Sequence, residues 1–256
     1  MTPRKRLVGV GVGPGDPELL TLRAVRVLRE AGVVVVPVVA DRDGIADRDG
    51  AADRPGRAEA TVLAHVDAAK VRRLPFAMDD TGGVTARSEK AWDDAASAVV
   101  GHLDAGTELV AFATIGDPNV YSTFHYLAAG VRALRPDVEV TTVPGITAMQ
   151  DLAARSGTVL VEGREPLTLL PLTAGPEVLE AALAGPGTVV TYKGGRHMDD
   201  VRAALARHGR AGDAVVGRSL GLDDEWIGPL DATDGPLPYL STVVAPPKRA
   251  LRGGKL

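Results

Sequence analysis

The fold is decided by residues 7–36, which read LVGVGVGPGDPELLTLRAVRVLREAGVVVV. The β-branched run from Leu7 to Val12 predicts a buried strand. Asp16 and Pro17 are typical of the N-cap and first turn of a helix, so a helix is expected to follow. The valines at 33–36 predict a second strand. This strand–helix–strand order favours a parallel sheet that is covered by helices.

The glycines of the first loop alternate strictly, at positions 9, 11, 13 and 15. A dinucleotide-binding fingerprint needs its third glycine three residues after the second, where Pro14 or Asp16 stands instead. Pro14 also removes a backbone N–H, and Asp16 places a carboxylate where a pyrophosphate would lie. We therefore reject a dinucleotide site. A tight strand-to-helix turn remains the simplest interpretation of the loop taken alone.

The same pattern continues along the chain and then restarts. Further strands are expected over residues 108–114 and 138–143, with helices over 86–103, 121–134 and 148–155. After a stretch rich in Gly, Glu and Arg near 156–166, strands are expected over 167–170, 188–192, 214–218 and 240–245, with helices over 176–183 and 198–208. We therefore expect an α/β protein with two α/β domains, residues 1–158 and 159–256, and a cofactor cleft between them.

Composition narrows the class of protein. The net charge of −4 disfavours a nucleic-acid binder, which is usually basic. The chain has no cysteine, which excludes disulfides, thiolate metal sites and cysteine nucleophiles and fits a cytoplasmic protein. No run approaches the roughly 18 apolar residues of a membrane span. We expect neither a nucleic acid nor a membrane as a partner.

An acidic segment interrupts the first domain at residues 41–57. Asp41-Arg-Asp-Gly is repeated from Asp47, and Asp53-Arg-Pro-Gly follows. A calcium loop of the EF-hand type needs three acidic or amide residues at alternate positions before the glycine, and this segment supplies two. We interpret it as a flexible surface insertion and expect no metal site.

Three more loops rich in glycine and polar residues follow expected strands: Gly116-Asp117-Pro118, Val143–Ala148 and Thr191–His197. In open α/β sheets, ligands bind at the carboxyl ends of the strands. Asp117 is interpreted either as a helix cap or as a carboxylate beside a cationic ligand group. Taken alone, each loop is explained by a polar turn as well as by a ligand site. Four such loops shared between two domains favour a ligand site.

In combination, the loops resemble those of the tetrapyrrole methylase family. The matching segments are Val8–Pro17 with Leu20-Thr21, Gly116–Pro118, Pro144–Ala148, Tyr192–Gly194 and Pro238–Thr242. The resemblance covers about residues 6–246, apart from the acidic segment. Within the family, GDPNVYSTFHYL at 116–127 is most similar to the branch that methylates carbon 20 of precorrin-2.

The resemblance implies an S-adenosylmethionine-dependent C-methyltransferase of cobalamin biosynthesis. It would be a homodimer that acts on a tetrapyrrole, precorrin-2 or its cobalt complex. The residues implied at the cofactor are Pro14, Gly116, Asp117, Val120, Ser122, Thr123, Thr147, Ala148, Tyr192, Lys193, Val216, Gly217, Leu240, Ser241 and Thr242. The tetrapyrrole carries many carboxylates, so cationic contacts are needed. The candidates for them are Arg87, Lys90, Arg196 and Arg218, with Lys193 and His197.

The methyl group of a sulfonium is already activated, so the protein mainly has to align the reactants in a dry site. No catalytic residue is assigned from the sequence. The candidates for a proton acceptor are Tyr121, His125 and His197. A half-buried helix histidine with no catalytic role is an equally good interpretation of His125.

The sequence departs from the family pattern at three places. Ile115 stands where a glutamate is common, Gly195 is an additional glycine before Arg196, and Gly217 replaces the glutamate of a Glu-Arg pair. Three alternatives stay open. One is a sibling enzyme acting on another precorrin or on uroporphyrinogen III. Another is a relative that methylates the modified histidine of elongation factor two, and the last is a non-catalytic binding protein on the same fold.

Overall fold

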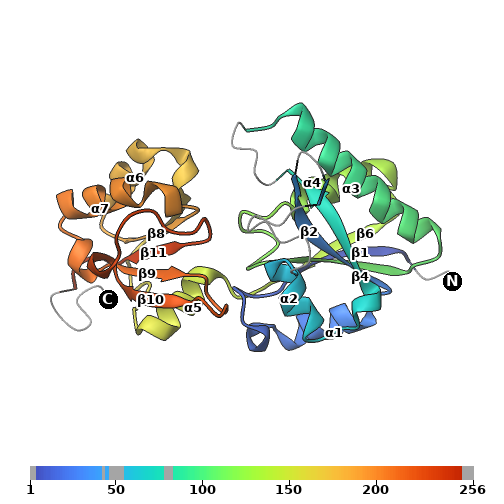
Figure 1. Cartoon of the computed structure of the whole chain (residues 1–256), viewed down its shortest axis with the longest axis horizontal. Helices are drawn as coiled ribbons and strands as arrows, with labels where there is room; N and C mark the ends of the chain where they lie inside the picture. Colours follow the sequence, from blue (N-terminus) through green and yellow to red (C-terminus); the bar gives the residue numbers. More distant parts are fainter. Residues whose placement is uncertain (1–3, 42–43, 46–54, 78–82, 250–256) are drawn as a thin grey trace. The chain divides into compact units, whose positions relative to one another are not determined.

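The computed structural model describes residues 4–41, 44–45, 55–77 and 83–249 of the chain. The chain folds into two compact units, Met1–Thr147 and Ala148–Leu256, which we describe one at a time (Figure 1). This division precedes helix α5 (Ala148–Ser156), whereas the boundary expected from the sequence follows it. The helix belongs to the second unit because Leu152 is buried with Val190 and Val244 of the C-terminal sheet.

The N-terminal sheet consists of β1 (Arg6–Gly11), β2 (Val33–Asp41), β3 (Gly44–Ile45), β4 (Val71–Phe76), β5 (Leu109–Thr114) and β6 (Glu139–Val143). The strand order is β3-β2-β5-β1-β6, and β4 pairs with β2. Every pairing is parallel except that of β2 with β3. The carboxyl ends of β5, β1 and β6 therefore lie side by side at one edge.

Helices cover both faces of this sheet. The helices α1 (Leu22–Glu30) and α2 (Arg57–Leu63) bury Leu28 and Val62 against one face, together with Ala111 of β5. The helices α3 (Ala86–Asp104) and α4 (Phe124–Leu134) pack on the other face, where Phe112 of β5 joins their core. Neighbouring residues of β5 thus enter different cores, as the two-residue period of a strand requires.

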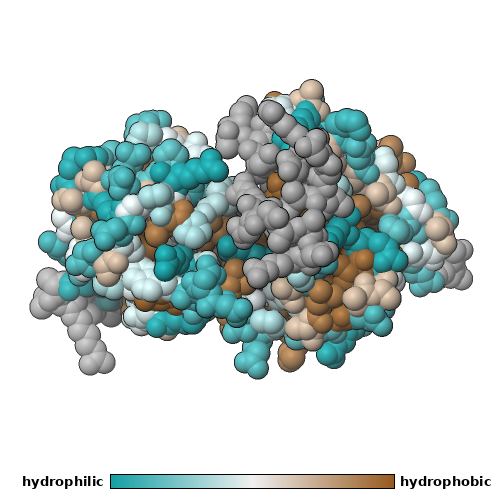
Figure 2. Space-filling model, viewed as in Figure 1, coloured by the Kyte–Doolittle hydropathy of each residue, from teal (hydrophilic) through white to brown (hydrophobic). Residues whose placement is uncertain are grey.

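The C-terminal unit holds a mixed sheet of β7 (Leu167–Pro171), β8 (Thr188–Tyr192), β9 (Val215–Arg218), β10 (Trp226–Pro229) and β11 (Thr242–Ala245), in the order β10-β9-β11-β8-β7. Only β7 and β8 pair in parallel. The helices α6 (Pro176–Leu183) and α7 (Met198–Arg207) share a core with one face, and α5 packs on the other. The outer side of α6 and α7 is mostly hydrophilic (Figure 2).

Two expected helices start later than the sequence predicted. The helix expected from Asp16 is a 3-10 turn over Pro17–Leu19, and α1 begins only after Thr21, whose side chain accepts the backbone N–H of Ala24. The helix expected from Tyr121 begins at Phe124, because Tyr121 has a left-handed φ of 49° that no helix tolerates.

Part of the acidic segment expected at 41–57 lies outside the described residues, and α2 begins at its end, at Arg57. Within the described part of the chain, no helix combines the length and the hydrophobicity needed to cross a bilayer.

A buried arginine supports the turn after α6. Arg210 is only 7% exposed, and its guanidinium donates to the carbonyl oxygens of Gly187 at 2.7 Å and Gly185 at 2.6 Å. Substituting Arg210→Met keeps the apolar stem but leaves both carbonyls without their donor. We expect unfolding by urea, followed by circular dichroism, to show a loss of about 1–3 kcal/mol. Arg132→Met on the exposed side of α4 should change stability by less than about 0.5 kcal/mol, and equal effects of the two would contradict this account.

Candidate functional site

Three loops meet at the carboxyl edge of the N-terminal sheet. They follow β1, β5 and β6, which are neighbours in the sheet. The backbone N–H of Gly116, in the second loop, donates to the carbonyl of Gly13 in the first at 2.8 Å. The left-handed φ of Gly13 (76°) and of Gly116 (69°) makes this pairing possible. The first two loops therefore form one hydrogen-bonded unit.

The third loop lies against this unit with no room for a side chain. A Cβ at Gly145 would lie 2.0 Å from the carbonyl oxygen of Gly116, and one at Gly11 would lie 2.5 Å from the same atom. Both distances are far inside van der Waals contact. The three backbones thus approach each other only because each loop carries glycine at the contact.

Asp117 ties the second and third loops together. Its Oδ2 accepts the backbone N–H of Gly145 at 3.0 Å, and its Oδ1 accepts that of Asn119 at 2.8 Å. The carboxylate does not cap α4, so the cap interpretation is replaced by a contact between loops. Two carboxylate oxygens offer about four acceptor positions, and these two bonds leave others for a cationic group. Asp117 is half-buried, so a ligand can still reach it.

The helix α2 braces the first loop from the side. The buried Oγ1 of Thr61 lies 3.2 Å from the carbonyl oxygen of Gly15 and 3.0 Å from that of Arg57, and its single hydrogen is shared between the two. Nε2 of His65 lies 2.8 Å from the carbonyl oxygen of Pro17. Neither residue was predicted from the sequence. The helix spans only seven residues and follows the acidic segment, so no periodic pattern marked it.

The start of α4 is fixed by buried contacts. Ser122 Oγ donates to Thr114 Oγ1 at 3.1 Å and accepts the backbone N–H of Phe124 at 3.2 Å. A Cβ at Gly9 would lie 2.6 Å from the ring of Phe124, so the helix rests directly on β1. The neighbouring Tyr121 is 44% exposed, and partial burial raises the pKa of its phenol.

In the C-terminal unit, two residues with strained backbones follow β8 and β9. Lys193 has a φ of 60° and Ser219 a φ of 50°, values that cost energy for residues other than glycine. The strands β8 and β9 both pair antiparallel with β11, so their carboxyl ends share one edge. Such strain is typical of functional loops, and it marks this edge as a candidate ligand-binding surface.

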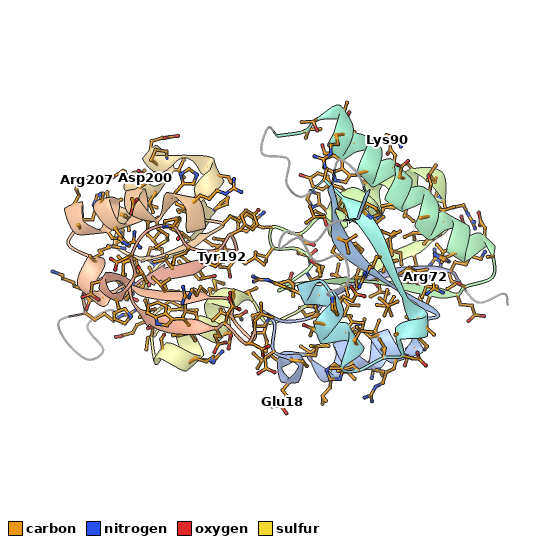
Figure 3. The ribbon with its side chains drawn as sticks, viewed as in Figure 1. Glu18, Arg72, Lys90, Tyr192, Asp200 and Arg207 are labelled. Carbon is orange, nitrogen blue, oxygen red and sulfur yellow. The ribbon has the colours of Figure 1, made fainter. Side chains whose placement is uncertain are left out.

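Tyr192 and Arg218 occupy the same edge. Figure 3 shows Tyr192 at the end of β8, and its hydroxyl accepts the backbone N–H of Met149 at the start of α5, at 3.0 Å. The guanidinium of Arg218 lies 5.9 Å from the ring centre of Trp226, within cation–π range. Its Nε is buried and has no hydrogen-bond partner among the described residues.

The structure distributes the predicted cofactor residues between the two units. Those on the carboxyl edge of the N-terminal sheet are Pro14, Gly116, Asp117, Val120, Ser122, Thr123 and Thr147. Those in the C-terminal unit are Ala148, Tyr192, Lys193, Val216, Gly217, Leu240, Ser241 and Thr242. The side chain of Val216 is fully buried in the core with α6 and α7, so only its backbone is left for a ligand.

The four predicted cations for the substrate have different surroundings. Arg87 and Lys90 are exposed in the first turns of α3, and Lys90 pairs with Asp94 at 2.6 Å (Figure 3). Arg196 is exposed in the loop after β8, whereas Arg218 is half-buried.

Known proteins are similar to this chain in sequence. The family model for tetrapyrrole (corrin/porphyrin) methylases matches residues 6–233. The precorrin-2 C(20)-methyltransferase of Sinorhizobium sp. is 35% identical over 242 residues, which cover 94% of this chain and 95% of that protein. The chain belongs to the tetrapyrrole methylase family. The expected family and the expected class of enzyme, a methylase, are therefore confirmed.

A second relative is longer. The cobalamin biosynthesis protein CobIJ of Mycobacterium bovis is 34% identical over 257 residues, which cover 99% of this chain but 49% of that protein. The chain thus spans about half the length of this relative.

Solved structures share the fold. The uroporphyrin-III C-methyl transferase of Thermus thermophilus, in complex with S-adenosyl homocysteine, has a TM-score of 0.60. It is 24% identical, and the alignment covers 94% of this chain and 97% of that one. With the two sheets described above, this likeness confirms the expected α/β fold class.

The glycine contact gives a sharp test. Gly145→Ala would force a Cβ onto the carbonyl of Gly116, so we expect a loss of about 3 kcal/mol or more and disordering of the third loop. Gly101→Ala is the matched control, because a Cβ there meets nothing within 4 Å on α3. It should raise stability by up to about 1 kcal/mol. Thermal unfolding of both variants checks the pair, and a harmless Gly145→Ala would refute the close approach.

A second test concerns the loop between β9 and β10. Glu225 accepts the backbone N–H of Gly221 at 2.7 Å and forms a two-pronged ion pair with Arg155. Hydrogen bonds from Arg155 hold the pKa of Glu225 below its ordinary value of 4.5. A lowered pKa in the folded state stabilises the protein above the ordinary value, and this contribution is lost as pH falls through the folded value.

We therefore expect a double-mutant cycle of Glu225→Gln and Arg155→Met to give a favourable coupling energy at neutral pH. The coupling should decline as the pH falls below 4.5 and vanish below the lowered pKa of Glu225 in the folded protein, where the carboxylate becomes protonated. Urea unfolding at successive pH values measures it. A coupling energy that does not change with pH would mean that the charge of Glu225 plays no part.

Proposed function

We propose that this protein transfers a methyl group from S-adenosylmethionine to carbon 20 of precorrin-2 or of its cobalt complex, as a step of cobalamin biosynthesis. Family membership supports methyl transfer to a tetrapyrrole. The Sinorhizobium relative, which matches nearly the whole chain, supports the substrate and the position. The observation that carries the proposal is the joining of three glycine loops and Asp117 at one sheet edge.

The N-terminal loops fit the proposed cofactor. The glycine contacts hold the three loop backbones against one another. At Gly116 a Cβ would have its nearest neighbour, Thr147 Cα, at 4.0 Å, so a ligand can approach the main chain there. Asp117 is held by two backbone N–H groups and keeps acceptor positions for the ammonium of the methionine part. Gly116, Val120, Ser122, Thr123 and Thr147 would line the same place. When bound, S-adenosylmethionine supplies a methyl group already activated on its sulfonium.

The C-terminal unit would bind the remainder of the cofactor. Tyr192 and Lys193 would contribute from the end of β8, with the backbone around Gly217 and the segment Leu240–Thr242. The strained backbone of Lys193 supports this role, since strain of this kind persists where a ligand site requires it. We further propose that each of the two domains carries one of these groups of loops. The protein is proposed to be a homodimer and to act in the cytoplasm.

Arg218 is the best supported contact for a substrate carboxylate. Its buried Nε lacks a partner among the described residues, and an unpaired buried donor on a charged group is costly. A bound carboxylate would satisfy it with a charge-assisted hydrogen bond. Arg87, Lys90 and Arg196 are exposed and would contribute through longer-range attraction.

The test is an anaerobic incubation of the protein with S-adenosylmethionine and precorrin-2, followed by mass spectrometry of the tetrapyrrole. We expect a gain of one methyl group, mapped to carbon 20. Parallel incubations with cobalt-precorrin-2 and uroporphyrinogen III distinguish the substrate from those of sibling enzymes. Calorimetry with S-adenosylhomocysteine measures cofactor binding independently.

Three outcomes would change the proposal in different ways. Methylation of uroporphyrinogen III alone would keep the enzyme class and replace the substrate. Binding of S-adenosylhomocysteine without methylation of any tetrapyrrole would favour a binding protein on the same fold. Absence of cofactor binding would contradict the assignment of the glycine loops.

A further inference from the structure

We propose that His125 is the proton acceptor of the reaction, and that its Nε2 removes the hydrogen from the carbon that receives the methyl group. The inference rests on the proposed function and adds a catalytic residue to it. It is drawn from the surroundings of His125 at the start of α4, directly after the loop that carries Gly116 and Asp117.

The need for an acceptor follows from the balance of the reaction. The bridging carbon of the tetrapyrrole carries one hydrogen and supplies the electron pair for the new carbon–carbon bond, while the methyl–sulfur bond breaks and its electrons stay on sulfur. The carbon then holds both the methyl group and the hydrogen. Conjugation returns when the hydrogen leaves as a proton and the electrons of its bond re-enter the ring system. One proton must therefore be accepted in each turnover.

The hydrogen bonding of His125 prepares one ring nitrogen for this task. Its Nδ1 lies 2.8 Å from the carbonyl oxygen of Ser122. A carbonyl oxygen can only accept, so Nδ1 carries the hydrogen, and in the neutral ring Nε2 keeps its lone pair. The residue is exposed, and Nε2 has no hydrogen-bond partner among the described residues. The lone pair is thus available to a substrate.

The ring is also held in place. Its centre lies 3.7 Å from that of Tyr126, which in turn stacks on Trp92 of α3 at 3.9 Å with an angle of 4° between the ring planes. Phe124, the preceding residue, is packed onto Gly9 of β1. An acceptor fixed in this way loses little freedom when the substrate binds, which is what general-base catalysis requires.

The two other candidates are less well prepared. Burial raises the pKa of Tyr121, so its phenol keeps its proton at neutral pH and is a poor proton acceptor. The side chain of His197 is 56% exposed, and its Nδ1 lies 3.5 Å from Asp200 on the surface of the C-terminal unit. Neither side chain combines a free nitrogen lone pair with the ring contacts and the carbonyl hydrogen bond of His125.

A first test needs no catalysis. Nitrogen-15 NMR of the imidazole groups, at a pH where they are neutral, distinguishes a ring nitrogen that bears hydrogen from one with a lone pair. We expect His125 to carry hydrogen on Nδ1. His65 is the internal control with the opposite expectation, because its Nε2 lies 2.8 Å from the carbonyl oxygen of Pro17. The chain has 5 histidines, and loss of one signal in His125→Phe assigns the resonance. Hydrogen on Nε2 of His125 would overturn the proposal.

A second test uses two variants. His125→Phe keeps an aromatic ring against Tyr126, and His125→Asn keeps an amide donor near the position of Nδ1 for the carbonyl of Ser122, but neither supplies a base. We expect His125→Phe and His125→Asn both to lower the rate of methylation about 10²- to 10⁴-fold while the affinity for S-adenosylhomocysteine, measured by calorimetry, stays unchanged. With deuterium at carbon 20 of the substrate, the variants should show a primary isotope effect larger than that of the wild type.

The control variant is His102→Phe, in the last turn of α3, which should methylate at the wild-type rate. An active wild type with equally active His125 variants would overturn this inference and leave the proposed function standing. Loss of S-adenosylhomocysteine binding in both variants would assign His125 to the cofactor site instead. A wild type that methylates no tetrapyrrole would remove the proposed function and this inference together.

Discussion

The arrangement of the N-terminal unit depends on one close contact between backbones. The loops after β1, β5 and β6 meet where Gly11, Gly116 and Gly145 have no Cβ, at distances that no other residue could reach. The hydrogen bond between Gly116 and Gly13 and the two bonds to Asp117 then hold the loops in register. The carboxylate of Asp117 keeps acceptor positions for a ligand.

The neighbouring helices support the loops that make this backbone contact. The helix α2 braces the first loop through Thr61 and His65, and α4 fixes the second through Ser122 and Phe124. In the C-terminal unit, the strained residues Lys193 and Ser219 stand at the ends of two strands that run in the same direction. Each unit thus presents loops with special backbone conformations at one edge of its own sheet.

Much of this could be predicted from the sequence because the signals were local. The helix Pro176–Leu183 and the strand Thr188–Tyr192 have the bounds that their residue patterns predicted. The family was identified from the loops and is confirmed by the similarity to known proteins. The predicted site residues and the domain boundary remain predictions.

The remaining features could not be read from local patterns. The strand β4 carries Pro75 and two adjacent arginines, Arg72 and Arg73, so its pattern is not that of a strand. It forms by pairing with β2 through one side of its backbone. The left-handed conformation of Tyr121 leaves no mark in the helical pattern, so the predicted helix began three residues before α4 does. The contacts of Asp117 with Gly145 and of Thr61 with Gly15 join residues 28 and 46 positions apart in sequence, beyond the reach of any local pattern.

The central claim is that these loops bind S-adenosylmethionine. Hydrogen–deuterium exchange with and without S-adenosylhomocysteine tests it most directly, because it locates the ligand on the chain without requiring turnover. The account predicts slower exchange in four segments, residues 9–17, 114–123, 143–149 and 191–197, and unchanged exchange in α6 and α7. Protection that falls on other segments and leaves these four unchanged would contradict it.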